Sequence, residues 1–310
     1  SAVAEVVFAA GRSDRDVVDL CANADVLVGS IHLDEVLSAN PSVRLVQVPA
    51  AGVDSESEIV MRHAGVRLTN SHANAHVTAQ FAVAMLLALL NRLVPGHEIV
   101  RLGRWDDRWL PPPPTNMSDM TVGVLGAGRV GTEIARLLRP FTQSVVGLKK
   151  RSGRGESRMF DRMAGLDELD QFLDHIDILF LAVPLTASTR NLITKRELAI
   201  LGETGFLVNV ARGEVVNERD LFHALRNGNI RGAAIEVWYD YNPMPDSRGR
   251  RYPYSEACPF HELENVLLSP HRAGWTEPAP DYWEDIIENV RRVAAGNDEL
   301  LNEVNVEAGY

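Results

Sequence analysis

The chain has 310 residues, a length that favours two domains because a single hydrophobic core seldom grows beyond about 250–300 residues. Hydrophobic residues make up 45% and charged residues 24%, which is typical of a globular protein and excludes a disordered chain. The formal net charge of -11 excludes a broad nucleic-acid-binding surface, which needs clustered Lys and Arg. No nucleic-acid partner is therefore expected.

Short β-branched runs alternate with helical stretches in the first third of the chain, a rhythm typical of βαβ units. The predicted strands there are residues 6–9, 26–28, 44–48 and 66–70. A continuously apolar segment at 73–93 predicts a long buried helix, ended by Pro95 and Gly96. We expect the chain to change domain near this point.

Four consecutive prolines at 111–114 predict a stiff extended connector. Further strands are predicted at 121–125, 144–148, 176–183, 205–210, 232–237 and 265–269, with helices between nearly all of them. This repetition predicts a parallel sheet that is covered on both faces and binds ligands at the carboxyl ends of its strands. Residues 283–295 predict an amphipathic helix, ended by Gly296, that packs back on the first domain.

Cysteine usage and hydropathy indicate a reducing, aqueous environment. Cys21 and Cys258 are far apart and lack metal-ligand or redox spacing, so neither a disulfide framework nor a metal site is expected. The longest apolar stretch, 81–90, is shorter than the roughly 20 residues that cross a bilayer, and no leader opens the chain. We expect a cytoplasmic protein with no membrane partner.

A glycine fingerprint directly follows the predicted strand 121–125 and opens a predicted helix. Gly126 permits a tight turn, Gly128 lets the backbone approach a pyrophosphate, and Gly131 permits close helix–strand packing. The free N–H groups of the helix N-terminus then face the phosphates. The predicted contacts to a dinucleotide come from Gly126, Gly128, Arg129, Val130 and Gly131.

The end of the next predicted strand indicates which dinucleotide is bound. An acidic residue usually stands there and binds the adenosine ribose, but this chain has Lys149, followed by Lys150 and Arg151. Cations pair with a 2′-phosphate and offer no acceptor to a free 2′-hydroxyl. The pattern predicts NADP(H) in preference to NAD(H); the alternative is a solvated basic loop.

Six ordered motifs resemble the D-isomer-specific 2-hydroxyacid dehydrogenase family over nearly the whole chain. They are the glycine fingerprint and residues 50–54, 183–186, 209–213, 232–238 and 269–274. The resemblance implies an α/β fold of two Rossmann-like or flavodoxin-like domains with parallel sheets and an active site in the interdomain cleft. The implied substrate domain is 1–97 plus 283–310, and the NAD(P)-binding Rossmann domain is 98–282. Members usually have one more strand and helix before 3–10, so an abridged or truncated substrate domain is expected.

Two residues in these motifs suit the reduction of a 2-oxo acid. Arg212 follows a predicted strand, and its guanidinium can bond both keto and carboxylate oxygens. His271 is the candidate acid–base, because an imidazole exchanges protons near neutral pH. The resemblance adds Ala51 and Gly52, whose N–H groups would hold the substrate carboxylate. It also implies cofactor contacts from Thr78, Val183, Pro184, Val210, Ala211, Glu236 and Gly274.

The chain departs from the family at Tyr241, which stands where a glutamate normally raises the pKa of the catalytic histidine. A phenol can orient an imidazole but supplies no charge near neutral pH, so the pKa of His271 is expected to stay closer to its ordinary value than it would beside a glutamate. Asp240 or Glu262 are alternative sources of the missing carboxylate. Arg272 and Trp275 flank His271; they either reach the substrate or pack on the surface.

The resulting hypothesis is an NADPH-dependent enzyme, a homodimer by family analogy, that reversibly reduces a small 2-oxo acid to a D-2-hydroxy acid. The missing glutamate leaves an alternative open, the oxidation of a small anion such as formate or phosphite. A non-catalytic nucleotide-binding, corepressor-like protein is the second alternative, since one fold serves several functions.

Overall fold

The computed structural model describes residues 4–8, 14–150 and 158–309, which form two compact units. Unit 1 is Ser1–Asn74 with Pro278–Tyr310, and unit 2 is Ala75–Glu277. The change of unit precedes helix α4 (Ala75–Leu90), whereas the sequence placed it after this segment, because α4 packs on the sheet of unit 2. The assignment of the two domains to substrate and cofactor stays a prediction.

Unit 1 contains a small parallel sheet of order β1-β2-β3. Its strands are β1 (Val26–Val28), β2 (Leu45–Gln47) and β3 (Arg67–Thr69), and its helices are α1 (Asp14–Leu20), α2 (Leu33–Ala39), α3 (Asp54–Val60) and α10 (Trp283–Ala294). The strand predicted at 6–9 is wrong over its described part, because Val6, Val7 and Phe8 are exposed and join no sheet. Residue 9 lies outside the described residues.

The C-terminal segment packs on unit 1, as the sequence predicted. Asn289 in α10 is fully buried, and its Nδ2 donates to Gln47 Oε1 of β2 at 2.7 Å. Further along, the Val304 N–H donates to the Leu68 carbonyl of β3 at 2.9 Å, and Val304 joins the core of this unit. Buried polar groups are therefore paired across the join, which fixes the segment in one register.

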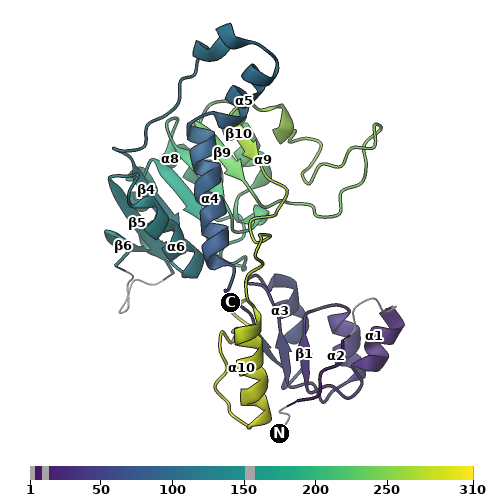
Figure 1. The fold of residues 1–310 in the computed structure, drawn as a ribbon. Coiled ribbons are helices and arrows are strands. Elements are labelled where there is room, and N and C mark those ends of the chain that lie inside the picture. Colours follow the sequence, from purple (N-terminus) through teal and green to yellow (C-terminus); the bar gives the residue numbers. More distant parts are fainter. Residues whose placement is uncertain (1–3, 9–13, 151–157, 310) are drawn as a thin grey trace. The chain divides into compact units, whose positions relative to one another are not determined.

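Unit 2 is built on a seven-stranded, all-parallel sheet of order β10-β9-β8-β7-β4-β5-β6 (Figure 1). The strands are β4 (Thr121–Leu125), β5 (Ser144–Lys149), β6 (Arg162–Gly165), β7 (Ile178–Leu181), β8 (Phe206–Asn209), β9 (Gly232–Ile235) and β10 (Val266–Leu268). The helices are α4, α5 (Leu93–Arg101), α6 (Arg129–Leu138), α7 (Leu169–Asp174), α8 (Lys195–Leu201) and α9 (Glu218–Arg226).

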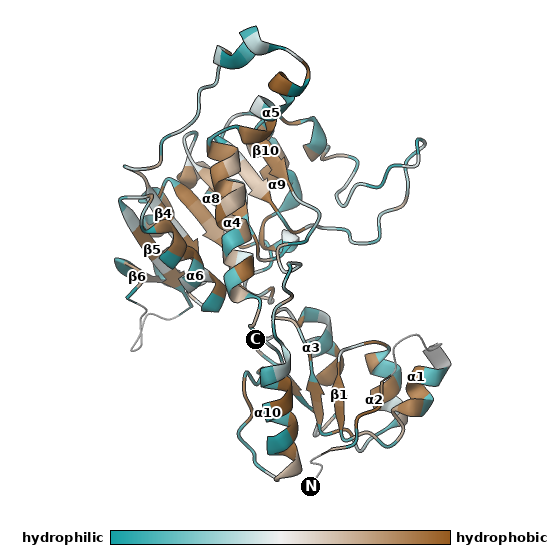
Figure 2. Cartoon of the chain, in the orientation of Figure 1, coloured by the Kyte–Doolittle hydropathy of each residue, from teal (hydrophilic) through white to brown (hydrophobic). Residues whose placement is uncertain are grey.

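Helices cover both faces of this sheet. Side chains of α4 and α6 pack on one face, and those of α7, α8 and α9 pack on the other. Most strand residues lie at the hydrophobic end of the scale in Figure 2, as expected for strands buried on both sides. The α/β class and the parallel sheets predicted from the sequence are confirmed.

The long helix predicted at 73–93 ends earlier than expected. Its chain breaks after Leu90, where Arg92 adopts a left-handed conformation with φ 51°, and α5 then begins at Leu93. Pro95 and Gly96 lie inside the first turn of α5 instead of ending α4. Proline is tolerated there because the N–H groups of a first helical turn lack intrahelical partners.

Over the described ranges, no single helix is both long and apolar enough to cross a membrane. The pair Ala75–Leu90 and Leu93–Arg101 satisfies the length and composition criteria only when the two are joined across a bend of 61°.

Candidate active site

The glycine fingerprint lies where the strand order of unit 2 reverses. From β4 the chain moves outward to β5 and β6, then returns to β7 on the other side of β4. Gly126 directly follows β4 and has φ 107°. It lies so close to the chain segment after β7 that a Cβ at this position would be 2.4 Å from the Ala182 carbonyl oxygen. Val183 and Pro184 come next in that chain. Parallel α/β sheets bind their ligands at such a switch point.

The other two glycines of the fingerprint differ in the space around them. A Cβ on Gly131, in the first turn of α6, would lie 2.0 Å from the Gly126 carbonyl oxygen. A Cβ on Gly128, the N-cap of α6, would meet no heavy atom within 4 Å. Gly131 therefore serves the packing of helix against turn, while Gly128 leaves open space beside the N–H groups of Arg129 and Val130.

This contrast predicts different outcomes for two alanine variants. Gly131→Ala should lower the free energy of unfolding by about 1–3 kcal/mol and also weaken dinucleotide binding, because the turn must move. Gly128→Ala should leave the melting temperature within about 1 °C, yet raise the dinucleotide Kd at least about tenfold, because its methyl group stands where a phosphate would approach. Calorimetry and thermal unfolding measure both; an unchanged Kd for Gly128→Ala would contradict a pyrophosphate site here.

The first of the basic residues predicted to bind the 2′-phosphate of NADP(H) lies beside this turn. The Gly126 N–H donates to the Leu148 carbonyl at 2.8 Å, which brings the end of β5 against the fingerprint. Lys149 is the last residue of β5 and Lys150 follows it, exposed to solvent. Arg151 lies outside the described residues.

Arg212 stands in a loop that its own neighbours hold in place. Asn209, the buried last residue of β8, accepts the Ala211 N–H on Oδ1 at 3.0 Å and donates through Nδ2 to the Arg212 carbonyl at 2.9 Å. The Arg212 Nη1 donates to the Ala211 carbonyl at 2.9 Å. This role of Asn209 was not predicted from the sequence, although an asparagine at a strand end is a turn signal.

His271 is fixed by the ends of two neighbouring strands. It follows β10 with φ 53°, a left-handed conformation that non-glycine residues rarely adopt. The Trp238 indole N–H, beyond β9, donates to the Ser269 carbonyl at 2.7 Å. Glu236, fully buried at the end of β9, accepts the Ala273 N–H on Oε1 at 2.5 Å. The turn formed by residues 269–273, called the histidine turn below, is therefore held to the end of β9 on both sides of His271.

Burial sets the pKa of His271 below the ordinary histidine value. Desolvation by the surrounding protein lowers the pKa most, the Glu236 carboxylate raises it, and the Arg212 guanidinium lowers it. Burial and Arg212 together exceed the effect of Glu236, which gives a downward shift that the sequence did not predict. The same interactions show that Arg212, Glu236 and His271 lie close together although they are remote in sequence.

Tyr241 contacts His271 from the position of the missing glutamate. The centroids of the two rings lie 5.2 Å apart, and the Tyr241 hydroxyl accepts a hydrogen bond from the backbone N–H of Trp238 at 3.2 Å. Neither alternative carboxylate acts on the imidazole. Asp240 is exposed and accepts the Asn242 N–H, and Glu262 acts on Tyr254. Glu236 is instead the carboxylate that raises the pKa of His271.

The remaining predicted residues are placed as follows. Val210 and Ala211 follow β8, Gly274 follows the histidine turn, and Thr78 is buried in the first turn of α4. Ala51 and Gly52 lie in unit 1, where their N–H groups donate to no acceptor among the residues the structure describes. No group of three or more His, Cys, Asp or Glu residues in the described ranges is arranged to hold a metal ion.

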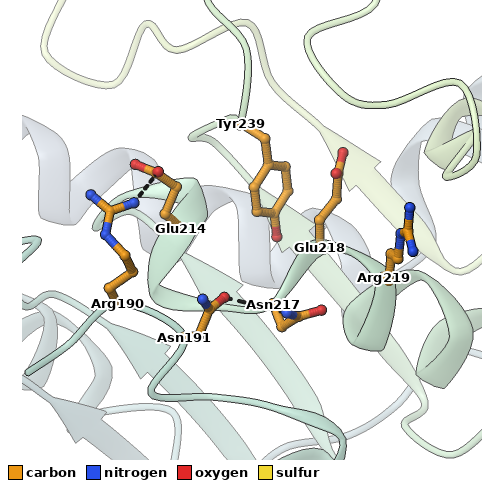
Figure 3. Close-up of a pocket in the computed structure, with 7 residues that line it drawn as sticks. All are labelled: Arg190, Asn191, Glu214, Asn217, Glu218, Arg219 and Tyr239. Atoms are coloured by element: carbon orange, nitrogen blue, oxygen red, sulfur yellow. Dashed lines mark hydrogen bonds and ion pairs between the residues drawn. The ribbon is translucent and has the colours of Figure 1, made fainter. Parts of the chain in front are cut away.

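A polar pocket of about 270 Å³ lies on the chain just beyond Arg212 (Figure 3). It is lined by Arg190, Asn191, Glu214, Asn217, Glu218, Arg219 and Tyr239. Arg190 and Glu214 form an ion pair across one side, and Glu218 accepts the Ser255 N–H. None of the sequence-predicted candidates lines this pocket, so it is separate from the arginine–histidine site.

A nicotinamide dinucleotide fits the residues at this edge of the sheet. The glycine turn leaves room at Gly128, and the second oxygen of Glu236, Oε2, is buried without a hydrogen-bond partner among the described residues. A buried carboxylate oxygen without a donor is costly, and the amide group of a nicotinamide supplies such a donor.

Comparison with known proteins agrees with this site. The family profile described as "D-isomer specific 2-hydroxyacid dehydrogenase, NAD binding domain" matches residues 83–273. The chain belongs to this family. As a member of this family, it is an oxidoreductase that binds a nicotinamide cofactor.

Relatives of this dehydrogenase include curated enzymes and solved structures. A glyoxylate reductase from Korarchaeum cryptofilum is 32% identical over 269 residues, which cover 84% of this chain and 76% of the relative. A glyoxylate reductase from Thermococcus kodakarensis is 31% identical over 260 residues, covering 82% and 74%. An NADPH-dependent glyoxylate/hydroxypyruvate reductase from Sinorhizobium meliloti, crystallised with NADP and malonate, is 28% identical, with a TM-score of 0.74 over 91% of this chain and 84% of that one.

Proposed function

We propose that this dehydrogenase reduces a small 2-oxo acid to a D-2-hydroxy acid with NADPH. The observation that carries the proposal is the grouping of Arg212, Glu236 and His271 at the carboxyl edge of the sheet that also bears the glycine fingerprint. A cation and an imidazole beside a dinucleotide site are what the reduction of a ketone requires. The two relatives named glyoxylate reductase support a 2-oxo acid as substrate.

Each residue of the group has one part in the proposed reaction. The bound cofactor supplies the hydride. Arg212 binds the keto oxygen and one carboxylate oxygen, which orients the ketone and stabilises the negative charge that develops on it. Protonated His271 donates its proton to that oxygen. Glu236 and Tyr241 are positioning residues, since Glu236 anchors the histidine turn and Tyr241 packs on the imidazole ring.

An activity screen tests the proposal directly. Absorbance of the reduced nicotinamide should fall when the enzyme and NADPH meet glyoxylate, hydroxypyruvate or phenylpyruvate. The product should be the D isomer on a chiral column. Formate and phosphite with NADP are the rival substrates, because Tyr241 stands where the family has its glutamate. Turnover of either anion without turnover of any 2-oxo acid would replace the proposed function.

Cofactor choice gives a second measurement. We expect kcat/KM to favour NADPH over NADH by at least about tenfold, the contribution of one charge-assisted hydrogen bond to a 2′-phosphate. Lys149→Asp should reduce or reverse this ratio, because it replaces the cation by the usual ribose acceptor. Lys195→Asp, which makes the same charge change at the exposed start of α8, is the matched control. A wild-type preference for NADH would contradict the predicted binding of a 2′-phosphate by these basic residues.

Three further properties of the enzyme are predicted from the sequence and the family resemblance. Cytoplasmic location, the homodimer implied by the family resemblance, and carboxylate binding by Ala51 and Gly52 stay predictions. For the homodimer, α5 offers support because it buries none of its residues and exposes Leu93, Val94 and Val100.

A further inference from the structure

The turn that follows His271 carries a second arginine in a fixed position. The Trp275 N–H donates to the Arg272 carbonyl at 2.9 Å, which closes the turn. The guanidinium carbon of Arg272 lies 4.6 Å from the centroid of the Trp275 ring, within the range of a cation–π contact. Stacking restricts the planar guanidinium and thereby reduces the entropy that it loses when it binds an anion.

Neither Arg272 nor Trp275 has a role in packing or ion pairing that explains its position. Trp275 is 75% exposed, so it contributes little to the core. Arg272 is exposed and forms no ion pair with a carboxylate in the described part of the chain, although the chain holds 42 acidic residues and 31 basic ones. A stacked arginine without an anionic partner, next to a candidate catalytic residue, is an available anion-binding group.

The sheet places this group at the same edge as Arg212. Arg212 follows β8 and Arg272 follows β10, with β9 between them. Neighbouring strands lie about 4.8 Å apart, so the two chain segments start about 10 Å apart at the same edge of the sheet. A substrate that Arg212 holds through its 2-oxo acid group, and that extends along this edge toward β10, brings its other end to Arg272.

We propose that Arg272, stacked on Trp275, binds a second anionic group, a carboxylate or a phosphate, at the end of the substrate opposite the 2-oxo acid. This inference rests on the proposed function and narrows its substrate class to 2-oxo acids with an anionic tail. Arg272 is then a specificity-determining residue. The charges that set the pKa of His271 are those of Glu236 and Arg212, so replacing Arg272 should not move the pH profile.

A matched pair of ligands tests the proposal without turnover. 2-Oxoglutarate and 2-oxopentanoate have the same chain length and differ by a terminal carboxylate in place of a methyl group. Calorimetry on the enzyme saturated with NADP+ measures the Kd of each. We expect the dianion to bind at least about tenfold more tightly, as one charge-assisted hydrogen bond allows. A second pair, 3-phosphohydroxypyruvate and hydroxypyruvate, shows whether phosphate is preferred to carboxylate.

Variants separate the arginine from general charge effects. Arg272→Met keeps the length of the side chain and should abolish the difference in Kd within each pair. Arg272→Lys, which keeps the charge but loses the planar fork, should retain part of it. Arg226→Met, the same change at the exposed end of α9, should retain all of it.

Each outcome bears on a single proposal. Equal Kd values for the two members of both pairs in the wild type, or a difference that survives in Arg272→Met, would overturn the anionic-tail proposal. An equal loss for both members in Arg272→Met would also overturn it, because it would indicate a structural role. If the expected differences in Kd appear but NADPH reduces none of these acids, the anion site stands and the proposed function fails.

Discussion

Arg212→Ala should lower kcat/KM for 2-oxo acids about a thousandfold while the Kd of the nicotinamide cofactor changes by less than about threefold. Removing one preorganised donor to a developing oxyanion costs about a hundred- to thousandfold in rate, and this variant also loses a bidentate carboxylate contact. The backbone should stay in place, because Asn209 holds the loop through the Ala211 N–H and the Arg212 carbonyl, which alanine retains.

A separate signature distinguishes this loss from misfolding. The Arg212 guanidinium lowers the pKa of His271, so its removal should raise that pKa relative to the wild type. The residual activity of Arg212→Ala should therefore extend to higher pH in the reductive direction. Arg212→Lys, with the charge but without the fork, should be intermediate in kcat/KM. Near wild-type turnover by the alanine variant would refute the proposed mechanism.

The fold of unit 2 was largely predictable because most of its strands are buried on both faces. Strands of this kind appear in the sequence as continuous apolar runs bounded by turn residues, and the six runs predicted from residue 121 onward overlap the observed strands β4, β5, β7, β8, β9 and β10. Edge strand β6 was missed. Its four residues, Arg-Met-Ala-Gly, include no β-branched side chain, and the strand pairs only with β5.

Local chemistry was a poorer guide where tertiary contacts decide the outcome. The helix break at Arg92 has no glycine or proline to signal it, and Pro95 fits inside a helix that begins just before it. Residues 6–8 have a strand composition but pair with no strand among the residues that the structure describes. A propensity is realised only where packing provides the neighbouring strand.

At the candidate active site, the sequence identified the functional residues but not the surroundings that set their properties. The motifs supplied Arg212 and His271, but the pKa of the imidazole depends on burial and on which charges lie beside it. Sequence spacing suggested Asp240 or Glu262 as the missing carboxylate, whereas the fold uses Glu236, a residue assigned only to cofactor binding. Sequence spacing does not show which of several nearby carboxylates a loop turns toward a given side chain.

His271→Asn should lower kcat/KM for reduction by about a hundred- to ten-thousandfold, the usual contribution of a positioned general acid. Asparagine adopts the left-handed conformation of this position more readily than most residues, so the turn and the melting temperature should be preserved. The cofactor Kd is the control. Wild-type turnover with an intact fold would show that another group supplies the proton.

The wild-type pH dependence follows from the direction of the pKa shift. Reduction needs protonated His271, whose pKa lies below the ordinary value, so kcat/KM for the 2-oxo acid should fall as pH rises through a pKa below about 6.5. Oxidation of the hydroxy acid needs the neutral imidazole, so its kcat/KM should rise through the same pKa and remain high at neutral pH. A reductive limb above the ordinary pKa would contradict this assignment.

Glu236→Gln tests whether the buried carboxylate acts on the imidazole through its charge. The glutamine amide oxygen can still accept the Ala273 N–H, so the histidine turn should be retained. Loss of the negative charge removes what raises the pKa of His271, and the reductive limb should move to still lower pH. A limb that stays in place while kcat falls would show that Glu236 acts by position alone, since only its charge couples to the protonation of the imidazole.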